Sequence, residues 1–69
     1  MGLSDHEYVN FSEDYELNHH LQKLGKSQSE ANRATLRKLG DKLKQETSVY
    51  FLTHLSFRTY LLRNLHLLA

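Results

Sequence analysis

Five histidines and a group of three acidic residues are the side chains in this sequence that could carry out chemistry. His19 and His20 are adjacent, so on a helix they point about 100° apart and cannot hold one metal ion as residues four positions apart do. Glu13, Asp14 and Glu16 could act as paired carboxylates, but the dipole of a helix also favours acidic residues in its first turn. We therefore interpret the histidines as exposed or partly packed, and the acids as part of a helix start.

No catalytic or cofactor-binding signature accompanies these residues. The sequence contains no cysteine, which excludes disulfides, thiolate metal sites and a cysteine nucleophile. It has neither a glycine-rich phosphate loop nor a Ser-His-Asp order. We predict that the protein is not an enzyme and that it holds no metal and no cofactor.

The chain is short, and its charges are divided along its length. A domain of 69 residues buries a small core that barely offsets its conformational entropy, so we expect it to have a partner. Residues 1–30 hold six acidic and two basic residues, residues 31–46 hold five basic and two acidic residues, and residues 47–69 hold two arginines and no acid. No signal peptide is visible, and we expect a cytoplasmic protein.

The amino-terminal residues predict an extended segment. Residues 1–6 have no periodic pattern, and we expect them to be disordered. Val9 and Phe11 alternate with Tyr8 and Asn10, which is the pattern of a short strand with one face on a core. A strand this short is not stable alone and needs a partner strand.

A first helix is predicted from about Glu13 to Leu24. Ser12 is the expected N-cap, and Gly25 is the expected left-handed residue that ends the helix. The apolar stripe of this helix consists of Leu17, Leu21 and Leu24.

A second helix is predicted to begin with a capping box at residues 27–30 and to run to about Gln45. In this box Ser27 caps the backbone of Glu30, and the Glu30 side chain reaches back to Ser27. Gly40 costs roughly 1 kcal/mol relative to alanine, so it marks either a close helix crossing or an early helix end. The apolar face consists of Leu36, Leu39 and Leu43, with Ala31 and Ala34 as small close-packing residues. The two helices should meet in a tight corner at residues 25–27.

Residues 47–69 are apolar on most sides and predict a third helix, although the β-branched and aromatic residues of the first half would also suit a strand. This segment could complete the chain's own core or a homodimer core, bind a partner protein, or lie on a membrane surface. It does not predict a transmembrane helix, because polar and charged residues interrupt it. The residues expected on a partner or dimer surface are Phe51, Leu55, Phe57, Leu61, Leu62 and Leu65.

Residues 8–44, with their alternating start, capped helix and basic second helix, resemble the ribbon-helix-helix repressors and antitoxins of the Arc, CopG and ParD kind. In that family two chains pair their strands, and the ribbon reads the major groove of DNA. The resemblance implies that Tyr8, Asn10 and Ser12 read bases. It also implies that phosphate is held by Lys26, Ser27, Gln28, Ser29 and Arg33. Free N–H groups at a helix start beside a lysine are a physically reasonable anion site.

A second resemblance concerns a family of short uncharacterised bacterial proteins with the pattern Asn-x-x-Glu-Asp-Tyr-Glu, followed by a helix that ends in Lys-x-Gly-x-Ser. The residues that fit this pattern without a gap are Asn10, Glu13, Asp14, Tyr15, Glu16, Leu17, Lys23, Gly25 and Ser27. This resemblance implies a small helical domain and carries no function.

Together these patterns predict a mainly α fold in one domain of residues 1–69, with a strand and two helices over residues 7–46 and an apolar helix over residues 47–69. We expect an intertwined homodimer that binds DNA as a repressor or antitoxin. A helix-turn-helix version would read DNA through Gln28, Asn32 and Arg33. The alternative is a non-enzymatic helical module that binds a protein partner, in which residues 47–69 could form the contact.

Overall fold

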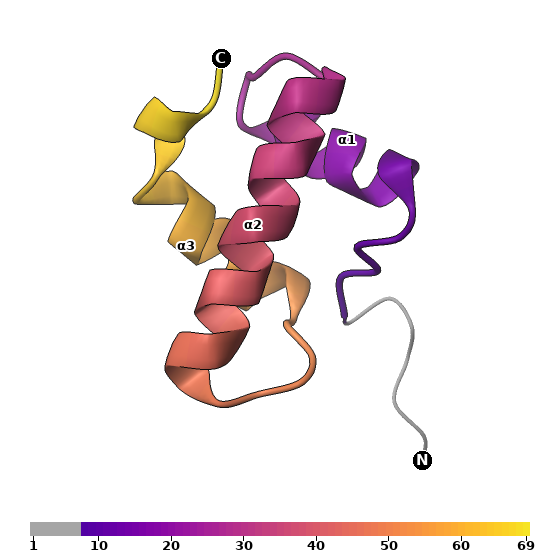
Figure 1. The fold of residues 1–69 in the computed structure, drawn as a ribbon. Helices are drawn as coiled ribbons and strands as arrows, with labels where there is room; N and C mark the ends of the chain where they lie inside the picture. Colours follow the sequence, from indigo (N-terminus) through magenta and orange to yellow (C-terminus); the bar gives the residue numbers. More distant parts are fainter. Residues whose placement is uncertain (1–7) are drawn as a thin grey trace.

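The computed structural model describes residues 8–69 and shows a mainly helical fold. Residues 8–69 form three α-helices, α1 (Asp14–Lys23), α2 (Glu30–Thr47) and α3 (His54–Leu62), and one turn of 3-10 helix, η1 (Leu65–Leu67). The long α2 runs through the middle of the fold and packs against both α1 and α3 (Figure 1). The predicted mainly α class is confirmed. The segment expected to be disordered, residues 1–6, and Glu7 lie outside the described residues.

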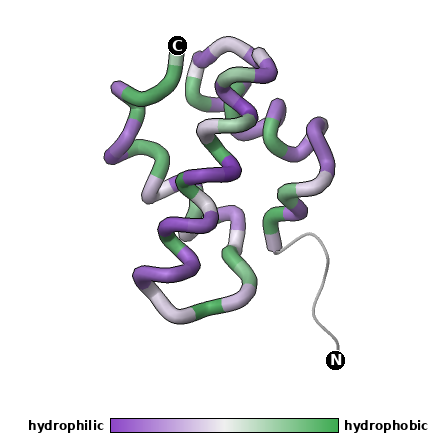
Figure 2. The backbone as a smooth tube through the Cα atoms, viewed as in Figure 1, coloured by the Kyte–Doolittle hydropathy of each residue, from purple (hydrophilic) through white to green (hydrophobic). Residues whose placement is uncertain are grey.

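The core lies where the three helices meet, and each helix contributes two buried apolar side chains to it. The apolar stripes predicted for the first two helices face this core, with Leu24 and Leu43 partly buried at its edge. In Figure 2 the α2 tube alternates between hydrophobic and hydrophilic stretches, as an amphipathic helix does. The buried apolar residues of the described part are Val9, Leu17, Leu21, Leu36, Leu39, Leu52, Phe57, Leu61 and Leu68.

The predicted amino-terminal strand is wrong, because only one bridge forms there. Tyr8 and Thr53 make an isolated antiparallel bridge, and the Val9 N–H donates to the Leu52 oxygen at 2.9 Å. The partner of the extended segment is therefore its own chain, so this pairing needs no second chain. Val9 is buried and Phe11 packs on the core, so the predicted inward face is confirmed.

The end of α1 is confirmed in detail and its start is not. The Gly25 N–H donates to the Gln22 oxygen at 3.1 Å, and the Lys26 N–H donates to the Leu21 oxygen at 2.9 Å. With Gly25 at φ 70°, these bonds form a Schellman motif. At the other end the N-cap is Glu13 rather than Ser12, and Glu13 makes no side-chain capping bond.

The start of α2 is shifted by two residues from the predicted capping box. Ser29 is the N-cap, and its Oγ accepts the Asn32 N–H at 3.1 Å. The predicted box does not form, because the Ser27 N–H, which Glu30 was expected to bond, donates to the Ala69 oxygen at 3.2 Å, and the Ser27 carbonyl accepts the Asn32 side-chain amide at 2.7 Å. The corner between α1 and α2 is thus shaped by a distant residue as well as by its own sequence.

Within α2, Gly40 has a role that neither prediction described. The helix does not end there and continues to Thr47, two residues beyond the predicted Gln45, and the atoms nearest to Gly40 belong to Phe11, which lies outside the helices. An ideal Cβ on Gly40 would lie 2.5 Å from the Phe11 Cε1 and Cζ atoms, so the glycine makes room for that ring.

The close-packing role predicted for two alanines is wrong. Ala31 and Ala34 are both exposed.

Residues 47–69 do not form one helix. Residues 48–53 are a loop, and α3 begins only after Thr53, whose Oγ1 accepts the Ser56 N–H at 3.1 Å as an N-cap. The bridge at Thr53 and the bond from Val9 to Leu52 keep the preceding residues extended, which stops a helix from starting earlier. Within residues 8–69 we find no helix with the length and apolar character needed to cross a bilayer.

Candidate functional site

The three residues expected to read DNA bases have local structural contacts. The half-buried Tyr8 ring packs edge-to-face on Phe51, with centroids 5.8 Å apart. The Asn10 Oδ1 accepts the Ser12 N–H at 3.1 Å and the Ser12 hydroxyl at 2.6 Å. The Asn10 N–H donates to Glu16 Oε1 at 3.0 Å. Asn10 and Ser12 are exposed and form the turn that leads into α1.

The residues expected to hold phosphate are gathered around the start of α2, where several of their polar groups are already bonded within the chain. The backbone N–H groups of Lys26 and Ser27 donate to Leu21 and Ala69, and the Ser29 hydroxyl caps α2. The Gln28 backbone carbonyl oxygen accepts a hydrogen bond from the Arg33 Nη1 at 3.0 Å.

Arg33 itself is bound to α1 as well as to this corner. Its Nη1 donates to Asn18 Oδ1 at 3.0 Å, and its Nε lies 3.7 Å from Asp14 Oδ2. The same carboxylate also accepts a 2.7 Å bond from Arg37. Asp14 is therefore a bridge between α1 and the basic side of α2, which locally neutralises part of the positive charge expected to face DNA.

The six residues expected on a partner or dimer surface divide into two groups. Phe57 and Leu61 are fully buried in the chain's own core, so neither is available to a partner. Phe51, Leu55 and Leu62 are 68%, 73% and 55% exposed. Leu65 is half-buried.

An aromatic surface forms where the loop of residues 48–53 meets the amino-terminal segment. We define the aromatic surface as Tyr8, Tyr15, Val49, Tyr50 and Phe51. Its most exposed member is Tyr50, at 88%. The residues come from three separate segments, and Tyr8 had been expected to face DNA instead.

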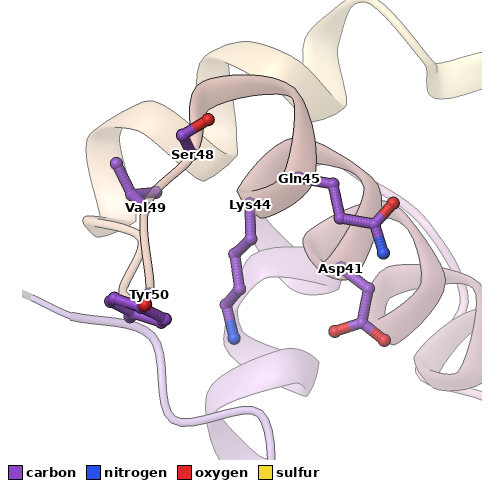
Figure 3. A pocket seen from close by; sticks show the side chains of 6 residues that line it. All are labelled: Asp41, Lys44, Gln45, Ser48, Val49 and Tyr50. Atoms are coloured by element: carbon purple, nitrogen blue, oxygen red, sulfur yellow. The ribbon is translucent and has the colours of Figure 1, made fainter.

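Three open hollows adjoin one another along the aromatic surface. The first, of about 450 Å³, lies between the end of α2 and Tyr50, and Figure 3 shows the Lys44 side chain extending into it. The second, of about 310 Å³, shares Val49 with the first hollow. The third, of about 370 Å³, shares Tyr8 and Phe51 with the second and also contacts Tyr15. We call these three hollows, linked one to the next by shared lining residues, the row of hollows.

A second candidate site is a row of polar side chains between α1 and α3. The His20 Nε2 and His54 Nδ1 atoms are 2.9 Å apart, and the two rings are stacked. The other nitrogen of His54, Nε2, lies 3.5 Å from Glu16 Oε1. His20 is only 4% exposed, and its Nδ1 has no hydrogen-bond partner in the described structure.

The surroundings of His20 disfavour its charged form. Burial lowers its pKa to about 4, and the positive groups at His54, His19, Lys23 and Arg58 act in the same direction. These residues line a separate hollow of about 220 Å³, which we call the basic pocket. The basic pocket consists of His19, His20, Lys23, His54 and Arg58.

The contact between His20 and His54 could not be predicted from the sequence, because the two residues are 34 positions apart. The burial of His20 could have been predicted, because this residue lies three positions after Leu17 and four before Leu24, on the apolar stripe. Residues 8–69 contain no group of three or more His, Cys, Asp or Glu side chains arranged to hold a metal ion.

Comparison of the chain with protein families, curated proteins and solved structures found no match in any of the three. Both family resemblances therefore stay predictions that depend on the residues that suggested them.

Proposed function

We propose that this chain is a non-enzymatic interaction module that binds an extended apolar segment of a partner protein along the aromatic surface. The observation that carries the proposal is the exposure of Tyr15, Tyr50 and Phe51, at 67%, 88% and 68%, around one row of hollows. Clustered exposed apolar side chains mark interaction sites, and aromatic residues supply most of the binding free energy in such sites.

The row of hollows suits an elongated ligand better than a compact one. Each hollow can accept an apolar side chain, and shared walls at Val49 and at the Tyr8 and Phe51 pair separate them. A peptide with apolar side chains at intervals matches this arrangement. Charged groups differ at the two ends of the row. The first hollow is lined by both Lys44 and Asp41 and the third by Glu13 and Glu16, so the more acidic end can set the direction of the peptide.

The backbone beneath the aromatic surface is well anchored, which favours binding. Leu52 is 3% exposed and accepts the Val9 N–H, and Thr53 caps α3. A loop that is already held in place loses less conformational entropy when a partner binds.

The DNA-binding interpretation is supported less well by this geometry. A ribbon-helix-helix dimer pairs the amino-terminal strand with a second chain, whereas Val9 here is bonded to Leu52 of its own chain. The Ser27 N–H, expected to hold phosphate, is bonded to Ala69. DNA binding of the ribbon-helix-helix kind would require these groups to change partners.

The test is a selection of peptides from a displayed random library against the full chain. Selected peptides should be rich in apolar residues, and Tyr50→Ser and Phe51→Ser should each weaken their binding by roughly tenfold or more, as expected for central aromatic contacts. Leu62→Ser and Leu67→Ser are matched controls, because both residues are exposed and neither lines the row of hollows. Equal loss of binding in the control variants would overturn the proposal.

Sedimentation equilibrium of the same variants distinguishes a partner peptide from a second copy of the chain. The proposal expects an unliganded monomer. A dimer that dissociates on Tyr50→Ser would show that the aromatic surface is instead covered by a second copy.

A further inference from the structure

The basic pocket concentrates positive charge without a carboxylate in its wall. Lys23 and Arg58 carry permanent charge there, and neither side chain forms an ion pair with an acidic residue within residues 8–69. The pocket is formed by α1 and α3, on residues that contribute neither to the aromatic surface nor to the corner between α1 and α2. It is therefore a separate site.

The histidines of the basic pocket form a hydrogen-bonded pair that can take up one proton. With neutral rings, His54 directs its Nε2–H at Glu16 and accepts the His20 Nε2–H at its Nδ1, which leaves the His20 Nδ1 as a bare acceptor. When a proton is added, His54 holds N–H groups on both nitrogens, His20 accepts at Nε2, and its own proton moves to Nδ1. Glu16 Oε1, 3.5 Å from His54 Nε2, stabilises the charged pair.

We propose that the basic pocket binds a small tetrahedral oxyanion of the phosphate class, and that binding is coupled to proton uptake by the His20 and His54 pair. Lys23 and Arg58 supply the charges that phosphate oxygens bind in proteins. Besides burial, the positive neighbours His54, His19, Lys23 and Arg58 lower the pKa of His20, and an anion in the pocket would offset their charge. Because linkage is reciprocal, an anion that favours the protonated pair must bind more tightly as the pH falls.

The groups that set this pH dependence lie on both helices. Glu16, His19 and Lys23 face the pair from α1, and Arg58 faces it from α3. Only Glu16 is acidic, and it lies on the far side of His54 from His20. Within residues 8–69 the charges of Lys23 and Arg58 therefore have no acidic partner until an anion enters.

Sulfate is the best first probe, because it carries the shape and charge of phosphate and does not titrate between pH 5 and pH 8. Full-length chain labelled with ¹⁵N is titrated with sodium sulfate, and sodium chloride keeps the ionic strength constant. We expect saturable shifts at the amides that line the basic pocket, and binding that tightens as the pH falls from 8 to 5. Linear shifts, or the same shifts with chloride alone, would overturn the proposal.

Charge variants test the position of the site. Lys23→Ala and Arg58→Ala should each weaken sulfate binding roughly three- to fivefold, the effect of one partly exposed charge partner. Lys42→Ala and Arg63→Ala remove the same charges from exposed residues outside the pocket and should leave affinity unchanged. If the control variants weaken sulfate binding as much as the pocket variants do, sulfate responds to the overall charge of the protein and the proposed site is wrong. All four residues are exposed, so the variants retain the fold.

Further titrations with inorganic phosphate and with glycerol 3-phosphate distinguish a free phosphate ion from the phosphate group of a small molecule as the natural ligand. Tighter binding of the monoester would assign the pocket to a phosphorylated small molecule, and tighter binding of inorganic phosphate would assign it to the free ion. If neither ligand binds saturably, the proposal is overturned.

Discussion

Asn32 and Ala69 hydrogen-bond each other in both directions. The Asn32 Nδ2 donates to the Ala69 oxygen at 3.3 Å, and the Ala69 N–H donates to the Asn32 Oδ1 at 3.1 Å. Asn32 is 3% exposed, and its Nδ2 also donates to the Ser27 oxygen. One buried amide thereby joins the carboxy-terminal residues to the corner that precedes α2, and the two segments lie side by side in Figure 1.

Replacing Asn32 with alanine should destabilise the fold by about 2 to 3 kcal/mol, because the change leaves backbone groups of Ser27 and Ala69 without partners. The amides of these two residues should also exchange faster with solvent than in the parent protein. Urea unfolding and hydrogen exchange measure the two effects. Gln28→Ala, at an exposed position nearby, is the control and should change stability by less than about 0.5 kcal/mol. Unchanged exchange at Ala69 would contradict the structural role of the amide.

Gly40→Ala should destabilise the protein even though alanine favours helices. The added methyl would lie 2.5 Å from two carbons of the Phe11 ring, so we expect the upper part of the roughly 1 to 3 kcal/mol that overpacking costs, which exceeds the roughly 1 kcal/mol gained in helix propensity. The Phe11 ring cannot move freely, because it packs edge-to-face on Phe57 at 5.0 Å and lies beneath Lys44. Thermal or urea unfolding gives the change in free energy.

A double-mutant cycle tests the cause of the Gly40 effect. In a Phe11→Leu background the clash is removed, so Gly40→Ala should become neutral or stabilising by up to about 1 kcal/mol. If Gly40→Ala is equally destabilising in both backgrounds, contact with the Phe11 ring is not its cause.

Stability should fall as the pH drops below neutral, because His20 is buried in its neutral form. Its pKa is about 4 in the folded chain, against about 6.5 when unfolded, so between these values the unfolded chain binds more protons. Stability from this residue is complete above the unfolded pKa and is lost as the pH falls toward the folded value. The loss should reach about 2 kcal/mol between pH 7 and pH 5.

Urea unfolding at several pH values measures this dependence, and variants assign it. His20→Gln removes the titrating group and should flatten the curve between pH 5 and pH 7, while the exposed control His66→Gln should leave the slope unchanged. An unchanged slope in His20→Gln would refute the assignment.

Hydrogen exchange at Val9 distinguishes a bridge within one chain from a ribbon between two chains. The Val9 N–H donates to Leu52 of the same chain, so its protection should be independent of protein concentration. A ribbon formed by two chains would lose protection on dilution by mass action. Exchange is measured at two concentrations about a hundredfold apart, with the Leu21 amide inside α1 as an internal control.

The features that sequence analysis predicted well are those decided within one or two turns of helix. Gly25 ends α1 because only a residue that tolerates positive φ fits there, and the bonds it closes reach no further than Leu21. The apolar stripes on α1 and α2 follow from the 3.6-residue period in the same way. The helix caps were harder to predict. Ser27 and Ser29 were both suitable N-caps, and their own chemistry does not choose between them.

By itself the sequence determined a mainly helical chain, the left-handed residue that ends α1, and the face that each of the first two helices buries. Only the tertiary structure decided that Ser29 caps α2, that Val9 pairs with Leu52, and that His20 meets His54. The physical reason is distance along the chain. His20 and His54 are 34 residues apart, and Asn32 and Ala69 are 37 apart. Such contacts form only after the helices have packed, when burial fixes which polar groups lack water and must find each other.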